Sequence, residues 1–532
     1  MKETVVFEAI LEQVANDPKG KGEAFEVAAK WWLQNEPGWA GFFQPHTVKL
    51  WKESDLAYGP DIGIDITAID VLGRNWAVQV KNWRADKALP KAEIDKFLSA
   101  SNTHKFYGRV LLTTTKEISR NAARALSDQE KECIVVDYEA LAKSEVWDQF
   151  LRGKQSLERQ TQQISLYPHQ KEAVKKVTDG FKEGTKRAQL LMACGTGKTI
   201  TAQRISESLD SELTVFLAPS LLLVQQTRSS WLNNSKSELA PLALAVCSDQ
   251  TVAQDEFGST VLELPFHVTT DHSEIERFLG LKGKKVIFCT YQSFSALEEG
   301  LMGASVSPGL VVFDEAHKLV GNRDRSFSSS LTSPCLADSR HLFMTATPKI
   351  FKPMGTKNND SEQQVLSMDN TEIFGEVLFN YSFGRAIKDN RLSKYEVVIM
   401  PVVDSEVRGM IENRTLLQLE TVDVDAEMLA IHAGLSKAMV GYEINRVITF
   451  HSSIQRAKDF AKFHPLIASK VFPHEDELKV DSTVLTGSDS ARKRKTVLDD
   501  LASTRQSEFK LVANARCLTE GVDIPSLDGI AF

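Results

Sequence analysis

The sequence predicts an α/β protein made of several sheets flanked by helices. Short apolar runs that end in polar residues recur between residues 215 and 516, which is typical of buried parallel strands whose carboxyl ends carry functional groups. Before them, residues 62–136 alternate strand-like and helix-like segments, as expected for a sheet covered by helices. A chain of 532 residues is long enough for roughly three or four domains. We expect a first domain at residues 1–148, a linker at 149–163, and two further α/β domains at 164–375 and 376–532.

Composition restricts the partners that the chain is expected to bind. The formal net charge is −8, so DNA binding would depend on local basic surfaces, such as residues 492–495 or Lys282, Lys284 and Lys285, unless these are solvated faces. The six cysteines include no Cys-x-x-Cys pair, which argues against a disulfide framework or a structural zinc site and fits the reducing cytoplasm. No apolar run approaches the ~18 residues of a membrane span, and we expect no membrane partner.

The first domain is predicted to be a compact sheet with helices around it. A helical pattern runs from Gly20 past Leu33, and strand-like runs at residues 62–71 and 76–80 are separated by a hairpin turn at residues 72–75. A helix at residues 91–101, a strand at 109–114, a helix at 118–126 and a strand at 133–136 follow.

The predicted hairpin carries a polar set suited to phosphodiester hydrolysis. If the loop is the three residues 72–74, Asp65 lies opposite Lys81, on the same face as Gln79. Asp65, Gln79 and the Val80 carbonyl would then hold Mg²⁺, while Lys81 would orient or deprotonate the attacking water. The alternative is a half-buried hairpin whose polar side chains face solvent.

A phosphate cradle is predicted at the start of the second domain. The apolar run that ends at Met192 leads into Gly195, Thr196, Gly197, Lys198 and Thr199. The glycines let backbone N–H groups approach a polyphosphate, Lys198 can reach the β and γ oxygens of ATP, and the Thr199 hydroxyl can bind Mg²⁺ where a helix begins.

Polar residues at later strand ends complete the predicted ATP site. Asp314 follows the strand 310–313 and would bind Mg²⁺ through water, and Glu315 would polarise the water that attacks the γ-phosphate. Gln170 can read the edge of adenine while Tyr167 packs against the ring. Further polar strand ends lie at residues 219–220, 290–291 and 345–347, and in the third domain at 449–452, 486–487 and 514–516.

Two family resemblances support this interpretation. Phe25-Glu26, Gly63-Ile64-Asp65 and Gln79-Val80-Lys81 resemble the Mrr-like branch of the PD-(D/E)xK nucleases, a restriction-endonuclease-like α/β fold. This resemblance implies Asp65, Gln79 and Lys81 as catalytic residues and Glu26 as a supporting acid, with Asp61 as a competing metal ligand. From Gln170 onward, six ordered elements resemble the motifs of superfamily 2 helicases of the DEAH kind, which consist of two RecA-like domains. That resemblance implies ATP-driven movement on DNA and places Asp523, in the segment 514–525, at the nucleotide.

A nuclease fused ahead of such a motor resembles bacterial restriction systems. In the Type ISP restriction-modification enzymes a methyltransferase and a target-recognition domain follow the motor, whereas a Type I or Type III subunit would receive specificity from a partner. A repair or remodelling helicase whose nuclease-like domain only binds DNA is a further alternative. The Gln-Gly-Arg segment that completes such motors is not found before Phe532, so we expect a truncated second RecA-like domain and slow ATP hydrolysis by this chain. Double-stranded DNA, ATP and Mg²⁺ are the expected ligands.

Overall fold

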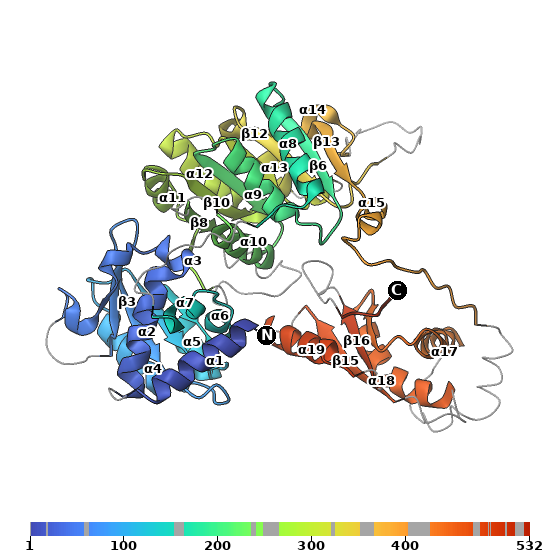
Figure 1. The fold of residues 1–532 in the computed structure, drawn as a ribbon, viewed down its shortest axis with the longest axis horizontal. Coiled ribbons are helices and arrows are strands. Elements are labelled where there is room, and N and C mark those ends of the chain that lie inside the picture. The colour runs from blue at the N-terminus through green and yellow to red at the C-terminus, as the bar shows by residue number, and fades with distance from the viewer. Residues whose placement is uncertain are drawn as a thin grey trace. The chain divides into compact units, whose positions relative to one another are not determined.

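The structure is a computed structural model of the 532-residue chain. It describes residues 2–17, 20–57, 63–153, 164–235, 241–247, 265–320, 325–351, 366–402, 426–471, 479–487, 489, 491–505, 508–515 and 526–532. The chain divides into two compact units, of which the first runs to Leu392 except for a short excursion, and the second contains Ser393–Phe532. We call residues 2–153 the N-terminal domain, 164–392 the central domain, and 393–532 the C-terminal domain (Figure 1).

The N-terminal domain is a five-stranded mixed sheet in the order β1-β2-β3-β4-β5. β1 and β2 are antiparallel, as are β2 and β3, whereas β3, β4 and β5 are parallel. The strands are β1 Lys49–Leu50, β2 Ile66–Ile69, β3 Asn75–Lys81, β4 Gly108–Thr113 and β5 Cys133–Val136. The helices are α1 Lys2–Ala15, α2 Lys21–Asn35, α3 Pro37–Ala40, α4 Ala92–Ser101, α5 Arg120–Ser127, α6 Tyr138–Ala142 and α7 Trp147–Leu151.

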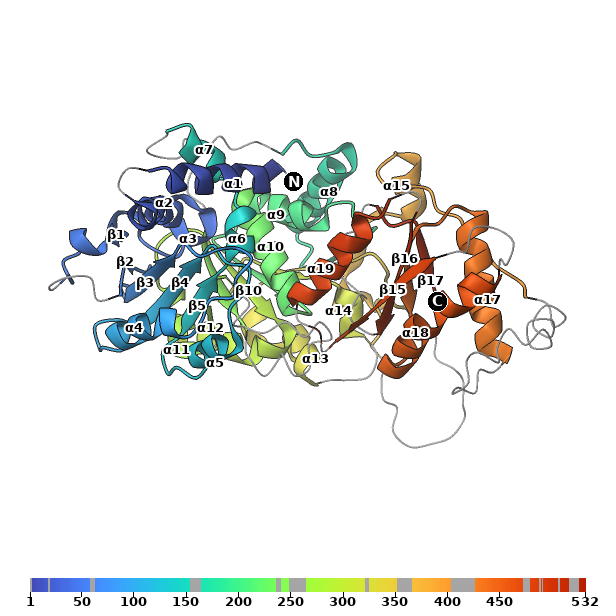
Figure 2. The same cartoon turned by 90° about the horizontal axis from the view of Figure 1, so that it is seen from below.

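Two hydrophobic cores cover the two faces of this sheet. The larger one joins α1, α2, α6 and α7 to one face, and the smaller one joins α4 and α5 to the other (Figure 2). Burial of apolar side chains on both faces is the main favourable contribution to the stability of such a sandwich. Trp147 and Phe150 of α7 belong to the larger core, so the folded N-terminal domain extends past residue 149, where we expected the linker to begin. Residues 154–163 of that linker lie outside the described residues.

The central domain is an eight-stranded, fully parallel sheet in the order β13-β6-β12-β11-β7-β10-β8-β9. Its strands are β6 Arg187–Met192, β7 Leu213–Ala218, β8 Leu242–Val246, β9 Val268–Thr269, β10 Lys285–Thr290, β11 Leu310–Phe313, β12 Arg340–Thr345 and β13 Glu376–Tyr381. Its helices are α8 Pro168–Lys182, α9 Lys198–Ser208, α10 Leu221–Asn233, α11 His272–Leu279, α12 Phe294–Ala304, α13 Arg325–Thr332, α14 Thr371–Phe374 and α15 Phe383–Lys388. The parallel strands predicted from the apolar runs are confirmed.

The edge strand β13 changes where the central domain ends. Glu376 to Tyr381 pair in parallel with β6, so a boundary at residue 375 would separate a strand from its own sheet. We therefore place the boundary near Leu392, where the first compact unit ends.

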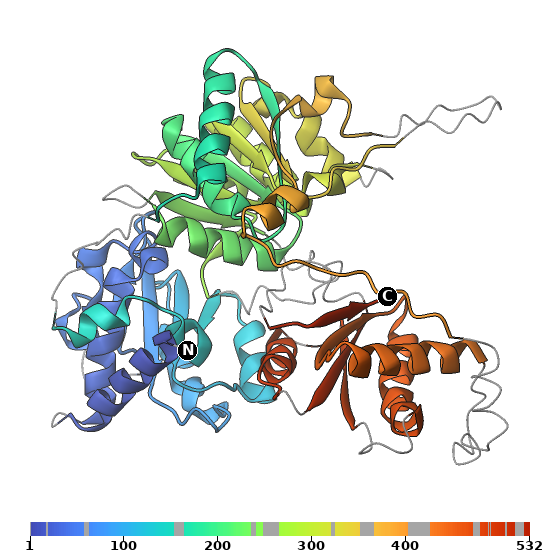
Figure 3. The same cartoon turned by 45° about the vertical axis from the view of Figure 1, so that its right-hand side comes forward.

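The C-terminal domain has a parallel sheet in the order β15-β16-β14-β17. Its elements are α17 Ala426–Gly441, β14 Arg446–Phe450, α18 Ile454–Val471, β15 Val480–Thr486, α19 Ala491–Ala502, β16 Phe509–Ala515 and β17 Gly529–Ala531. Helices α17 and α18 pack on one face and α19 on the other (Figure 3). Across the described residues, no helix is long and apolar enough to cross a membrane.

Candidate nuclease and ATP sites

The loop of the β2–β3 hairpin lies one residue earlier in the sequence than predicted. Ile66 pairs with Val78 and Ile69 with Asn75, and the Asp70 N–H donates to the Arg74 carbonyl at 3.0 Å. The loop is therefore residues 71–73 and not 72–74. Asp65 lies just before β2, and its N–H donates to the Val78 carbonyl at 2.9 Å, so it is not opposite Lys81 as predicted. Gln79 and Lys81 are two residues apart on β3 and so lie on one face of the sheet, whereas the common face with Asp65 stays a prediction.

This hairpin offers oxygen atoms that fit a divalent metal. The Asp65 Oδ2 accepts a hydrogen bond from the Val80 N–H at 2.6 Å. Gln79 is buried, with 4% of its surface exposed, and its Oε1 has no hydrogen-bond partner within the described part of the chain. A buried acceptor without a donor is uncommon and is satisfied when a cation binds it. No cluster of three His, Cys, Asp or Glu side chains suited to a metal occurs among the described residues, so this site would combine one carboxylate with amide and carbonyl oxygens. Asp61, the competing ligand, lies outside those residues.

A glutamate that the sequence analysis did not select contacts Lys81. The Lys81 Nζ lies 3.4 Å from the Glu93 Oε2, and Glu93 is in the first turn of α4. Gly63 has a φ of +93°, and a Cβ atom there would lie 3.2 Å from the backbone nitrogen of Phe97. Helix α4 therefore packs directly on the backbone two residues before Asp65, which positions Glu93 beside the hairpin.

Glu26 lies on α2, one turn after Glu23. Glu23 forms an ion pair with Lys52 at 2.6 Å, and this hydrogen bond, with the nearby charge of Glu26, raises the pKa of Lys52. The supporting catalytic role expected of Glu26 stays a prediction.

The predicted phosphate loop has the backbone that a phosphate cradle requires. Gly195 and Gly197 have φ values of +75° and +85°, a region that glycine enters without steric penalty. Gly197 precedes the first residue of α9, Lys198, so the free N–H groups of that helix end face the loop. Thr199 is the second residue of α9. A Cβ atom on Gly197 would lie 2.2 Å from the Gln170 Nε2, so the loop also has no space for a side chain there.

Lys198 and Glu315 form the charged centre of this site. The Lys198 Nζ lies 3.2 Å from the Glu315 Oε1. Burial opposes the charge of Glu315, but a hydrogen bond with His317 and the charge of Lys198 outweigh it and lower the Glu315 pKa to about 2. Burial likewise opposes the charge of Lys198, whose pKa is nevertheless raised by Glu315 and Asp314. Both groups are therefore charged at neutral pH, as a phosphate-binding lysine and a water-polarising carboxylate require.

The elements around Glu315 hold it in an unusual backbone conformation. Glu315 has a φ of +47°, and the preceding Asp314 is buried at the end of β11, with its carbonyl accepting from the Tyr291 hydroxyl at 2.7 Å. The His317 Nδ1 lies 2.9 Å from the Thr345 Oγ1. This contact joins the Asp-Glu-Ala-His element to the end of β12, one of the predicted polar strand ends.

Gln170 supports the phosphate loop. Its Oε1 accepts from the Tyr167 N–H at 2.9 Å, and its Nε2 donates to the Thr196 carbonyl at 3.1 Å. His169 also contacts the Thr196 carbonyl, at 3.1 Å, and stacks on Tyr381 with ring centroids 4.1 Å apart. The sequence analysis did not select His169 or Tyr381. Recognition of adenine by Gln170 and Tyr167 stays a prediction.

The C-terminal domain presents predicted polar tips at β15 and β16. The Thr486 N–H donates to the Asp489 Oδ2 at 2.8 Å. Within the predicted basic run, Lys493 pairs with Asp489 at 2.6 Å and Arg494 is buried; in the central domain Lys284 pairs with Asp210 at 2.5 Å. Asp523 lies outside the described residues.

Together the three domains define a class of protein in which a nuclease-type domain precedes an ATP-driven motor. Residues 34–157 match the family model described as restriction endonuclease. Residues 163–350 match the family model described as Type III restriction enzyme, res subunit. The chain thus carries a nuclease domain and helicase domains that resemble those of restriction enzymes, and these domain classes use ATP and a divalent metal ion.

The known relatives match a larger share of this chain than this chain matches of them. A probable helicase A859L of African swine fever virus (isolate Pig/Kenya/KEN-50/1950) is 24% identical over 353 residues, which are 65% of this chain and 35% of the relative. The Type I restriction enzyme EcoAI endonuclease subunit of Escherichia coli is 24% identical over 265 residues, 48% of this chain and 26% of the relative. The chain therefore spans about a third or less of the length of these relatives.

A solved structure matches almost the whole chain. The ATP-dependent Type ISP restriction-modification enzyme LlaBIII bound to DNA has a TM-score of 0.78 and 25% sequence identity, over 98% of this chain and 35% of that one. The expected fold class, a restriction-endonuclease-like domain followed by RecA-like domains, is confirmed. In its domain order the chain resembles one third of a Type ISP enzyme.

Proposed function

We propose that this chain supplies the nuclease and the ATP-driven translocase of a bacterial restriction enzyme that cleaves foreign double-stranded DNA. The observation that supports the proposal is the buried Gln79 Oε1 of β3, which lacks a hydrogen-bond partner among the described residues. The charged Lys198–Glu315 centre in the same chain supplies the ATP site of the motor.

In the nuclease site, Mg²⁺ bound by Asp65, Gln79 and the Val80 carbonyl would polarise the scissile phosphate and acidify a bound water. Lys81 orients that water or accepts its proton, and its charge stabilises the developing phosphorane. The contact of Glu93 with the Lys81 Nζ at 3.4 Å keeps the ammonium near the hairpin before DNA enters.

In the ATP site, Lys198 binds the β and γ oxygens and leaves Glu315 when the phosphate arrives. Glu315, charged at neutral pH, then polarises the attacking water. Gln170 keeps the phosphate loop in place through the Thr196 carbonyl, and Asp523 is proposed to contact the nucleotide from the C-terminal domain.

Substitution of Lys81 by Ala tests the nuclease assignment in the intact enzyme. We expect loss of Mg²⁺-dependent cleavage of plasmid DNA with DNA-stimulated ATP hydrolysis retained. Lys143→Ala, an exposed lysine of the same domain, is the matched control and should cleave normally. Unchanged cleavage by K81A would favour the second candidate function, a repair or remodelling helicase whose nuclease-like domain only binds DNA.

Substitution of Lys198 by Ala tests whether the motor gates the nuclease. We expect K198A to lose ATP binding and any cleavage that needs translocation, whereas Lys182→Ala on exposed α8 surface keeps both. Cleavage by K198A at the normal rate would show that the nuclease acts without the motor. We also propose that methyltransferase and target-recognition domains lie elsewhere in a longer protein or on a partner. The proposed location of the protein is the cytoplasm.

A further inference from the structure

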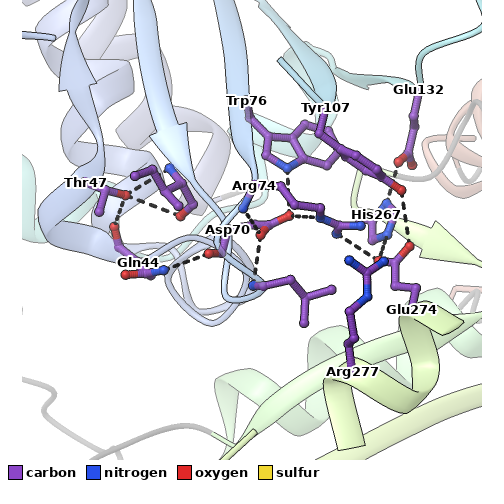
Figure 4. A network of polar contacts seen from close by, with 12 residues as sticks. Gln44, Thr47, Asp70, Arg74, Trp76, Tyr107, Glu132, His267, Glu274 and Arg277 are labelled. Atoms are coloured by element: carbon purple, nitrogen blue, oxygen red, sulfur yellow. Dashed lines mark hydrogen bonds and ion pairs between the residues drawn. The ribbon is translucent and has the colours of Figure 1, made fainter. Parts of the chain in front are cut away.

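A buried polar network joins the N-terminal domain to the central domain. His267, immediately before β9 of the central domain, lies between two carboxylates (Figure 4). Its Nδ1 lies 2.5 Å from the Oε2 of Glu132 in the N-terminal domain, and its Nε2 lies 2.6 Å from the Oε1 of Glu274 on α11. One imidazole ring therefore bridges acids from the two domains.

The turn of the β2–β3 hairpin makes the second half of this network. The Arg74 Nη2 donates to the Glu274 Oε1 at 2.8 Å. The Arg74 guanidinium also stacks on Tyr107, 3.8 Å from the ring centroid. The Tyr107 hydroxyl donates to the Glu274 Oε2 at 3.3 Å. Glu274 of the central domain thus accepts hydrogen bonds from two residues of the N-terminal domain.

Asp70 prepares Arg74 for this contact from within the N-terminal domain. Its fully buried carboxylate accepts from the backbone N–H groups of Leu72 and Arg74, from the Arg74 Nε at 2.6 Å and from the Trp76 Nε1 at 2.9 Å. These bonds fix the turn before it meets Glu274, so little side-chain freedom is lost when the domains pack.

A second buried cation joins the domains at α10. Arg228 is 6% exposed, and its Nη2 donates to the Gly38 carbonyl of α3 at 3.2 Å. Its guanidinium lies 4.3 Å from the Phe266 ring centroid. A Cβ atom on Gly38 would lie 3.1 Å from the Arg228 Nη1, so the two helices approach closely here. Because the two domains are joined at two separate buried contacts, one domain cannot rotate about either contact alone.

The charges of the network favour a closed joint. Burial lowers the pKa of His267, but Glu132 and Glu274 outweigh burial and raise it to about 9. Burial opposes the charge of Glu274, but His267 and Arg74 outweigh burial and lower the pKa of Glu274. Opening the joint would separate Glu132 from His267 and Arg74 from Glu274.

We propose that the N-terminal and central domains move as one rigid body, joined at Arg74–Glu274–His267–Glu132 and at Arg228–Gly38. Given the proposed function, the motor then carries the nuclease site on its first RecA-like domain. The same hairpin bears Asp65, Gln79 and Lys81 at its open end and Arg74 at its turn. Helix α10, which contains Arg228, is capped at its N-terminus by Ser220, one of the predicted polar strand ends. The N-terminal end of α10 in the motor and the nuclease hairpin are thereby held at a fixed distance from each other.

The test measures a distance between the two domains in the 532-residue chain. Spin labels on unnatural amino acids replace the exposed Arg124 of α5 and the exposed Met302 of α12. We expect one narrow distance distribution that is the same without ligand, with a non-hydrolysable ATP analogue, and with that analogue plus duplex DNA. A broad or ligand-dependent distribution would overturn the proposal.

Variants of the joint provide the second arm of the test. In Glu274→Gln and in the milder Glu132→Gln we expect a broad distance distribution in place of the single narrow one. The far-UV circular dichroism spectrum and ATP binding should be retained in both variants. Glu299→Gln is the matched control, because it removes an exposed carboxylate that lies 3.9 Å from His272 in the same domain. A narrow distribution in both joint variants would contradict the assigned role of the network. Because the distances do not depend on cleavage, a failed K81A test would leave this result standing.

Discussion

The charge of His267 predicts a specific pH dependence of the domain joint. His267→Gln keeps a polar side chain but removes the charge. A rise of the His267 pKa from 6.5 to about 9 corresponds to roughly 3 kcal/mol of stabilisation. Because the folded-state pKa is the higher one, this contribution is complete below pH 6.5 and is lost as the pH rises through about 9.

The assay is hydrogen exchange of the amides in β9 and α11, compared between wild type and H267Q. We expect wild type to be better protected below pH 6.5, and the difference to disappear above pH 9. Tyr107, with a pKa raised mainly by burial to about 12, does not titrate in this window. Neither does Arg74, whose pKa Glu274 and Asp70 raise against the effect of burial.

Burial raises the Glu36 pKa to about 7. Glu36 titrates in both proteins, so the difference between them isolates His267. His272→Gln on the exposed end of α11 is the control. If the amide protection of wild type and of H267Q falls in parallel between pH 6.5 and pH 9, the reasoning is refuted.

Three further predictions concern the two sites. Gly197→Ala should weaken ATP binding at least ~10-fold, since a Cβ atom would lie 2.2 Å from the Gln170 Nε2 at a φ of +85°; nucleotide titration measures this. Gly63→Ala should reduce DNA cleavage but not ATP hydrolysis, because its φ of +93° strains any other residue and a Cβ atom 3.2 Å from the Phe97 nitrogen would push α4 away. Glu93→Gln should reduce DNA cleavage with ATP hydrolysis retained, because it removes the carboxylate that lies 3.4 Å from the Lys81 Nζ.

Each of these has an outcome that would contradict it. Gly22→Ala, where a Cβ atom meets nothing within 4 Å, should leave both activities unchanged and serves as the glycine control. Normal ATP affinity in G197A would mean that the loop opens away from Gln170. Normal cleavage in G63A would mean that α4 does not position the hairpin. Cleavage by E93Q at the wild-type rate would show that Glu93 has no part in the site.

The features that could be predicted from the sequence depend on local backbone chemistry. The phosphate loop was predictable because Gly195, Gly197 and Lys198 are adjacent, and their φ values and helix start follow from residue type. The parallel strands were predictable because each is a continuous apolar run. The hairpin was placed one residue late, although Gly73, with a φ of +82°, is where a three-residue loop requires a left-handed residue. The side chain of Asp70 fixes that loop.

The domain joint could not be predicted, because its members are far apart in the chain and ordinary in type. Arg74 and Glu274 are 200 residues apart, and each alone resembles a surface charge. Likewise, the contact between Glu93 and Lys81 depends on the close packing of α4 against Gly63, and the support of the Thr196 carbonyl by His169 depends on tertiary structure. β13 was assigned to the wrong domain because the local sequence does not determine the order of strands in a parallel sheet.

The position of β13 also determines the order in which the protein can fold on the ribosome. β6, which leads into the phosphate loop, is the first strand of its sheet to be synthesised, but its neighbours β12 and β13 are made last. Glu376 pairs with Ala188, a separation of roughly 190 residues that corresponds to about 10 to 40 s of synthesis. During that interval β6 lacks both partners, and an unpaired apolar strand invites aggregation. We therefore expect nascent chains to need chaperones until β13 emerges, and the phosphate loop to bind nucleotide only after almost the whole central domain has been made.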